Sequence, residues 1–297
     1  MRKLLVAMLV IVLAVSSALV LVACGGGNVD LPGRKWTNKE VLSYEMYEGE
    51  TKVGALVITT ERIGSGEQTL NATGEKHVVS ASSVKGTRVT MAASDLNGNV
   101  IMASESILDG FTTLASYKQV KYNGTEYTVK ARFDGKRYRY SVNGAEEKKM
   151  KIKAGFVDNE LLYTVLRCYA IEDSYTGTYT VVDAVAGTKE ELAISTANAD
   201  ARYNGTPYQV EGNTVNQIKV VTGDGIVSYV TNVKCVELQV AKAKSPIGSP
   251  IFVSYSVEGT DGLSVLGEGS TGNSSTHIPL RIKENNVTYK LAAIECK

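Results

Sequence analysis

The sequence predicts a mainly β protein, built as a large antiparallel curved sheet or half-barrel with one central helix at about residues 159–170. Sixteen Tyr, 28 Gly and only five Pro in 297 residues favour strands joined by tight turns. Asn-Gly and Asp-Gly pairs recur between alternating segments, and helical spacing stands out at residues 157–169. We expect residues 36–297 to form a single β domain. A hairpin motif that occurs twice raises the alternative of two similar halves meeting near 155–175.

The first hairpin is predicted at Val41–Tyr47 and Lys52–Glu61, joined by a turn at residues 48–50. One face of the returning strand, which we expect to be the buried face, is formed by Val53, Ala55, Val57 and Thr59. Asn97-Gly98 predicts another hairpin corner within Gln68–Met102.

A three-stranded meander is the sharpest pattern in the chain. Its strands are Tyr117–Tyr122, Tyr127–Phe133 and Tyr138–Val142, each followed by Asn-Gly or Asp-Gly. These dipeptides favour the positive φ angles that a two-residue hairpin turn requires. Apolar and basic residues alternate along the last two strands, so one face is expected to be buried and the other charged.

One segment has helical rather than alternating spacing. Its apolar residues are Val157, Leu161, Leu162, Val165, Leu166 and Tyr169. They predict a helix of about three turns, near the mean length for globular helices, capped by Asp158 or Asn159. We expect its apolar face to plug the concave side of the sheet.

Strands resume after the helix and continue to the end of the chain. They are predicted at Gly177–Val185, Glu191–Ser195, Thr206–Val210, Gln217–Val221, Gly225–Val240, Ile251–Val257, Ile278–Lys283 and Val287–Ile294. Residues 259–275 are expected to form a Gly/Ser/Thr-rich loop. The repeated corner is Tyr-Asn-Gly-Thr-x-Tyr, at residues 122–127 and again at 203–208.

The amino terminus has the anatomy of an export signal. Arg2 and Lys3 precede an uncharged apolar run, Leu4–Ala23, and small residues lead into Cys24. The run is long enough to span a bilayer, but no Lys or Arg cluster follows it to stop transfer. Leu21-Val22-Ala23-Cys24 resembles the lipobox of bacterial lipoproteins. The resemblance implies that residues 1–23 are a cleaved signal peptide and that Cys24 is lipidated.

The predicted lipidation of Cys24 places the mature chain on the extracytoplasmic face of the cell membrane or envelope. The membrane would be a partner through acyl chains on Cys24, since each buried methylene contributes about 0.8 kcal/mol. Residues 24–35 are glycine-rich and are expected to form a flexible tether. The leader holds two of the 32 basic residues and none of the 31 acidic ones, so the mature chain is close to neutral. Such a balance argues against nucleic-acid binding.

Three segments resemble the envelope family catalogued as domain of unknown function 3108. They are the opening strand pair from Leu42-Ser43-Tyr44 to Gly54, the helix segment 158–167, and the closing Ile278-Pro279-Leu280-Arg281-Ile282. The chain is more loosely similar to half-barrel carrier lipoproteins, in which a curved sheet wraps an apolar cavity. The family implies no catalytic residues.

The sequence gives no sign of catalysis, a metal or a cofactor. His77 and His277 are two hundred residues apart, and neither lies in a triad or metal-ligand spacing. We therefore expect a protein that is not an enzyme and holds no metal. Once Cys24 is lipidated, Cys168, Cys235 and Cys296 remain, so one disulfide with a free thiol or three free thiols are both open.

One stretch is strongly basic. Between Lys118 and Lys153 there are eleven bases and four acids. The simplest explanation is a solvated outer face. Alternatively, an anionic-surface patch that meets lipid head groups or an envelope polymer is formed by Lys130, Arg132, Arg137 and Arg139.

Two classes of function fit these patterns. The first is a lipid-anchored binding or structural lipoprotein that holds an apolar or amphipathic ligand in its curved sheet. The second is a cell-surface assembly or adhesion module without a small-molecule pocket, acting through exposed sheet faces and edges. A filled core with an exposed apolar or aromatic patch would favour the second class. The sequence does not identify a protein partner.

Overall fold

The computed structural model describes residues 39–80, 86–110, 112–122, 124–153, 155–167, 175–243, 250–257 and 277–296. The signal peptide, the tether, Cys24, Cys168 and the loop at 259–275 lie outside these ranges. Among the described residues, no helix is long and apolar enough to cross a membrane.

The described chain is mainly β, as predicted, with one short helical segment. The strands are β1 Lys39–Glu48, β2 Thr51–Arg62, β3 Gly66–Leu70, β4 Glu75–Val79, β5 Gly86–Asp95, β6 Val100–Asp109, β7 Thr112–Tyr122, β8 Thr125–Phe133, β9 Arg137–Val142, β10 Lys148–Lys151, β11 Val157–Asp158, β12 Thr176–Asp183, β13 Thr188–Tyr203, β14 Thr206–Val210, β15 Asn213–Val221, β16 Val227–Val230, β17 Val233–Lys242, β18 Ile251–Ser256, β19 Pro279–Glu284 and β20 Val287–Cys296. The helical segment is a 3₁₀ turn, η1 Asn159–Leu161, continued by α2 Leu162–Leu166.

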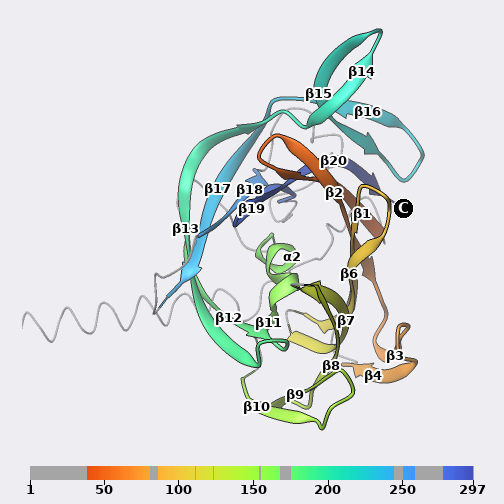
Figure 1. Cartoon of the computed structure of the whole chain (residues 1–297), viewed down its shortest axis with the longest axis vertical. Helices are drawn as coiled ribbons and strands as arrows, with labels where there is room; N and C mark the ends of the chain where they lie inside the picture. Colours follow the sequence, from red (N-terminus) through yellow and green to blue (C-terminus); the bar gives the residue numbers. More distant parts are fainter. Residues whose placement is uncertain are drawn as a thin grey trace, which may run out of the picture.

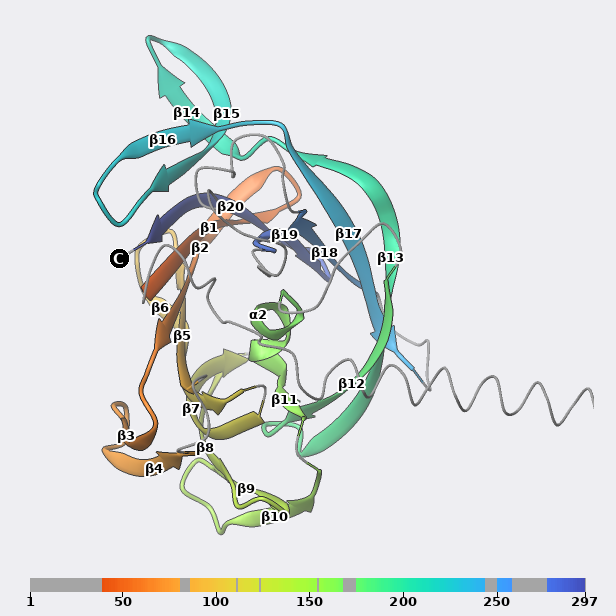
Figure 2. The ribbon, with the colours of Figure 1, turned by 180° about the vertical axis from the view of Figure 1, so that it is seen from behind.

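One large sheet curls around the helix (Figures 1 and 2). β1 lies between β2 and β20, so the two ends of the described chain pair antiparallel in the middle of the sheet. From β2 the sheet continues through β5, β6, β7, β8 and β9 to β10. From β20 it continues through β19, β18, β17, β13 and β12 to β11. The pairings are antiparallel except for short parallel contacts of β11 with β12 and of β15 with β20.

The two ends of this curled sheet meet through side chains. β10 pairs only with β9, and β11 only with β12, among the described strands. An apolar cluster bridges the ends, formed by Val129, Ala131, Tyr138, Tyr140, Ile152, Phe156, Val182 and Ala184. The Phe156 ring contacts the rings of Tyr138 and Phe133, at centroid distances of 5.4 and 5.1 Å. We call this junction the seam. Side-chain packing closes the barrel-like shape here without a continuous backbone ladder.

The hairpins predicted around residues 48–50 and 97–98 and in the meander are confirmed. The second copy of the repeated corner, at 203–208, does not form a hairpin, because β13 pairs with β12 and β17 whereas β14 pairs with β15. The buried face of β2 is also the opposite of the one expected. Its buried residues are Gly54, Leu56, Ile58 and Thr60. Leu56 and Ile58 lie opposite Tyr44 and Leu42 of β1, which are buried too. Leu and Ile present more apolar area than the valines and alanine of the other face, so their burial contributes more free energy to folding.

One predicted strand, Gly225–Val240, is two strands in the structure. β16 ends at Val230 and β17 begins at Val233, and Asn232 between them has a φ of 56°. The break allows β16 to pair with β15 while β17 crosses to β13. β13 is correspondingly longer than expected, with 16 residues.

The central helix is shorter than predicted but lies where it was expected. All five residues of α2 are buried, and its four apolar residues pack in one core cluster with residues of β1, β18 and β19. Residues 168–170 of the predicted helix lie outside the described ranges. Asp158 occupies the position before the 3₁₀ turn but makes no capping hydrogen bond.

Polar contacts also fix the helix inside the sheet. The Arg167 guanidinium pairs with both carboxylate oxygens of Glu40, with Nη2 3.0 Å from Oε2, and its Nε donates to the His277 carbonyl at 2.9 Å. The Tyr255 hydroxyl donates to the Tyr163 carbonyl at 2.7 Å. Arg167 and Glu40 are both fully buried. α2 is therefore packed inside the curl of the sheet and held there by both apolar and polar contacts.

Three strands stand away from this body. β14, β15 and β16 form an antiparallel unit, joined to the large sheet where β15 runs parallel to β20. We call this unit the projection. It stands at the top of Figure 1.

Candidate functional site

The predicted basic patch forms one surface on β8 and β9. Arg132 and Arg139 are direct cross-strand partners, and Lys130 lies two residues from Arg132 on the same face. Opposite this face, Val129, Ala131, Tyr138 and Tyr140 are buried. The alternation predicted from the sequence is confirmed.

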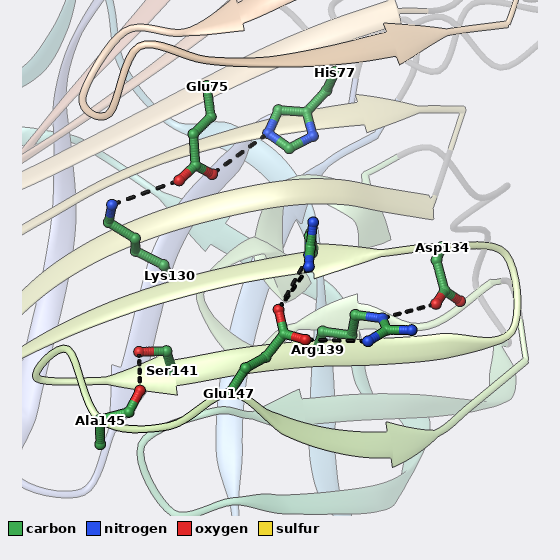
Figure 3. Close-up of polar contacts among 9 residues, drawn as sticks. Glu75, His77, Lys130, Asp134, Arg139, Ser141, Ala145 and Glu147 are labelled. Atoms are coloured by element: carbon green, nitrogen blue, oxygen red, sulfur yellow. Dashed lines mark hydrogen bonds and ion pairs between the residues drawn. The ribbon is translucent and has the colours of Figure 1, made fainter.

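Acidic residues from neighbouring turns and strands accompany these bases (Figure 3). Glu147 lies between Arg132 and Arg139, at 2.9 and 3.1 Å, and Asp134 is 2.8 Å from Arg139. Glu75 of the β3–β4 hairpin is 3.5 Å from Lys130. Hydrogen bonds from Arg139 and from the backbone of Arg137 and Lys136 lower the pKa of Asp134 to about 2. The surface therefore carries much less net positive charge than the strands alone suggest.

A second polar group lies inside the sheet, and sequence reasoning missed it as a site. The Lys118 ammonium is 2.5 Å from Glu160 Oε2, 3.9 Å from Asp158 Oδ2 and 3.2 Å from Asn159 Oδ1. The Lys118 side chain is 1% exposed, and Asp158 is completely buried. We call Lys118, Asp158, Asn159 and Glu160 the Lys118 cluster.

Burial and charge act in opposite directions in the Lys118 cluster. Burial acts to lower the pKa of Lys118, but the charges of Asp158 and Glu160 outweigh it and raise that pKa above its usual value. Burial raises the pKa of Glu160, and Lys118 offsets this only in part. The Tyr138 hydroxyl interacts with Asp158 and Ser116, and burial together with the charge of Asp158 raises the pKa of Tyr138. Buried charged groups are costly unless they are paired and hydrogen-bonded, which marks this cluster as unusual.

The sequence holds only a weak signal for the Lys118 cluster. Lys118 lies on the inward face of β7, where an apolar side chain is the usual occupant. Its partners follow 40 to 42 positions later, where Asp158 and Asn159 look like helix caps. Only the curl of the sheet brings β7 next to η1.

The projection carries a concentration of exposed apolar side chains. Five of the nine large, exposed apolar residues of the described chain lie there: Val210, Val215, Ile226, Val227 and Tyr229. In the registers of β14, β15 and β16, Tyr208 is opposite Val215, and Val227 and Tyr229 are opposite Val221 and Lys219. The Tyr208 and Tyr229 rings also contact each other, with centroids 5.9 Å apart. β14 and β16 each pair only with β15 among the described strands, so the unit also presents two strand edges.

The remaining candidate residues form no common site. The His277 ring is buried, with Nδ1 2.7 Å from the Ser256 carbonyl oxygen, whereas His77 is on β4 beside Glu75. Cys235 and Cys296 are free and buried, and burial raises the pKa of both thiols. Within the described ranges, no group of three or more His, Cys, Asp or Glu side chains is placed to hold a metal ion. The structure does not describe Cys24.

The described chain is thus a mainly β protein with one large curled sheet around a short buried helix and a projecting three-stranded unit. No protein-family model matches the sequence, and no curated protein matches it. One similar solved structure is the β-barrel-like protein of domain of unknown function DUF1849 from Brucella abortus. It is 9% identical, with a TM-score of 0.43, over 88% of this chain and 99% of that one. The resemblance to domain of unknown function 3108 stays a prediction.

Proposed function

We propose that this chain is a non-enzymatic envelope lipoprotein, anchored through Cys24, that works as a surface assembly module through the projection. The observation that carries the proposal is the exposed apolar face on β14–β16, in a protein whose concave side holds the buried helix α2. Clustered exposed apolar residues are characteristic of interaction sites in proteins. Interface cores are enriched in aromatic residues, and Tyr208 and Tyr229 are examples here.

The helix inside the curled sheet argues against the alternative of a carrier. A carrier with an internal ligand would need space on the concave side of the sheet, because ligand pockets bury most of the ligand surface. α2 (Leu162–Leu166) lies on that side and is fully buried, and the Tyr255 hydroxyl donates a hydrogen bond to the Tyr163 carbonyl. An outward-facing role therefore fits the described residues better than an internal ligand.

The projection is tested with a charge placed on its apolar face. Val227→Lys should abolish cross-linking of the full-length chain to its neighbours in intact cells, because a lysine is costly to bury in an interface. Val78→Lys is the matched control, since Val78 is an exposed valine on β4, outside the projection. Unchanged cross-linking in Val227→Lys, or equal loss in both variants, would count against this face as the contact surface.

The anchor is tested separately with a Cys24→Ala chain. We expect the unaltered chain to incorporate a labelled fatty acid and to fractionate with membranes, and the variant to lose the label. Labelling that persists in Cys24→Ala would show that acylation does not depend on Cys24. No labelling of the unaltered chain would rule out acylation.

A further inference from the structure

We propose that Lys118 and Asn159 form an intramolecular amide cross-link, with Glu160 as the proton carrier. This inference concerns the Lys118 cluster and does not depend on the proposed function. The cross-link would join β7 to the 3₁₀ turn at the start of the central helix.

The three reacting groups are already in contact. Lys118 Nζ is 3.2 Å from the side-chain carbonyl oxygen of Asn159, and 2.5 Å from Glu160 Oε2. Packing holds the surrounding side chains in place, since Ser116, Tyr138 and Leu161 are all buried. Groups held in contact by a rigid frame react as if at very high concentration. A single turnover per molecule is enough, so the reaction can be slow.

The chemistry balances with no outside reagent. Glu160 takes a proton from the Lys118 ammonium, and the neutral amine attacks Cγ of Asn159 to form a C–N bond. Glu160 then donates a proton to Nδ2, the Cγ–Nδ2 bond breaks, and ammonia leaves. The attacking nitrogen returns its surplus proton to Glu160, which ends protonated. Burial favours that neutral form, because it raises the pKa of Glu160.

The surroundings suit the attack and the departure of ammonia, whereas the raised pKa of Lys118 opposes the first proton transfer and makes the reaction slow. Lys118 is almost completely buried, so the amine is shielded from water once it has lost its proton. Asn159 is exposed as a residue, which leaves a path for ammonia to depart. Asp158 Oδ2 lies 3.9 Å from Lys118 Nζ, beyond hydrogen-bond distance. Its negative charge holds the lysine in the cluster without occupying the amine in a hydrogen bond.

The bond would reinforce the weakest part of the curled sheet. β7 belongs to the arm of the sheet that ends at β10, whereas η1 directly follows β11, the end of the other arm. These arms meet at the seam through side chains. A covalent link between residues 118 and 159 closes a loop across that junction, and such links stabilise chiefly by restricting the unfolded chain.

The test is mass spectrometry of the purified full-length chain, digested under denaturing conditions. We expect a branched peptide that joins the Lys118 and Asn159 segments, with a mass one ammonia below the sum of the two segments. Lys118→Arg keeps the positive charge but should abolish the branched peptide, and Glu160→Gln should reduce its yield at least tenfold. Lys130→Arg, which changes an exposed lysine on β8, is the matched control and should retain it.

Other outcomes would overturn the proposal. Complete recovery of the two segments as linear peptides from the unaltered chain would show that no bond forms. A branched peptide lighter by one water would place the link on Asp158 or Glu160. Loss of ammonia that persists in Lys118→Arg, without a branched peptide, would indicate cyclisation at Asn159 alone. Because the unaltered chain decides the matter, misfolding of a variant would not obscure the result.

Discussion

At the residue scale, the ion pair of Glu40 and Arg167 is the contact that ties the helix to the sheet. Both side chains are fully buried, and Arg167 also donates to the backbone of His277. Removing one partner of a buried pair leaves an uncompensated charge, whereas replacing both with apolar groups can be neutral. The pair therefore specifies where the helix sits more than it adds net stability.

Arg167→Met should lower the free energy of unfolding by about 3–5 kcal/mol, the usual cost of breaking a buried pair. The double variant Glu40→Leu with Arg167→Met should recover much of that loss, because no charge remains buried. Urea unfolding measures both, and Arg132→Met is the control at an exposed pair. Equal losses in the single and double variants would mean that packing of the Arg167 side chain, rather than its charge, matters.

Asp134 gives a residue-scale prediction for pH. Its pKa falls from 3.8 to about 2 because Arg139 and two backbone amides donate to it. A depressed folded-state pKa adds stability that is complete above 3.8 and lost as the pH falls through about 2. In acid unfolding experiments, the stability advantage over Asp134→Asn should shrink across that interval. An advantage that is constant with pH would contradict the assignment.

At the same scale, the sequence was least informative about Lys118. Nothing in the sequence marks Lys118 as an inward-facing residue of β7 or reveals that Asp158 and Glu160 lie opposite it. The sequence also does not reveal that Glu147 and Glu75 lie beside the predicted basic patch and reduce its net charge. In each case the partner comes from a different element, and only tertiary structure sets that distance.

At the element scale, the turns were the features that the sequence predicted most reliably. The turns at Asn97-Gly98, Asp134-Gly135 and Asn143-Gly144 are where they were predicted, and Gly98, Gly135 and Gly144 all have positive φ. The failures have physical reasons. The buried face of β2 was misassigned because both faces carry apolar residues, and the predicted strand at 225–240 breaks at Asn232, which adopts positive φ without a glycine.

Gly205 makes the close turn that leads from β13 into the projection. A Cβ there would lie 2.2 Å from the backbone carbonyl carbon of Gln217, and the φ is +87°. Gly205→Ala should therefore displace β14 from β15 and speed amide exchange across residues 206–217.

Gly212→Ala provides the matched control for this prediction. Gly212 also has a positive φ, +81°, but nothing lies within 4 Å of a Cβ built on it. It should show only the backbone cost of a left-handed alanine, roughly 1–2 kcal/mol. Similar exchange rates in the two variants would show that contact with Gln217 is unimportant.

At the scale of the whole molecule, the fold is an open sheet whose ends are brought together around a buried helix. β1 and β20 pair in the middle of the sheet, so the chain must be nearly complete before the sheet can assemble. Long-range pairing of this kind predicts slow folding. The sequence predicted a curved sheet with a central helix, but it did not predict the projection. Nothing in the sequence distinguishes the strands of the projection from the other strands, because only their pairing sets them apart.

At the same scale, we propose that acyl chains on Cys24 hold the β body beside a membrane. The most direct measurement is the mass of the amino-terminal peptide from the protein purified out of its native envelope. The account predicts a chain that begins at Cys24 and carries a thioether-linked diacylglycerol. A peptide that retains residues 1–23 and carries no fatty acyl mass would contradict it.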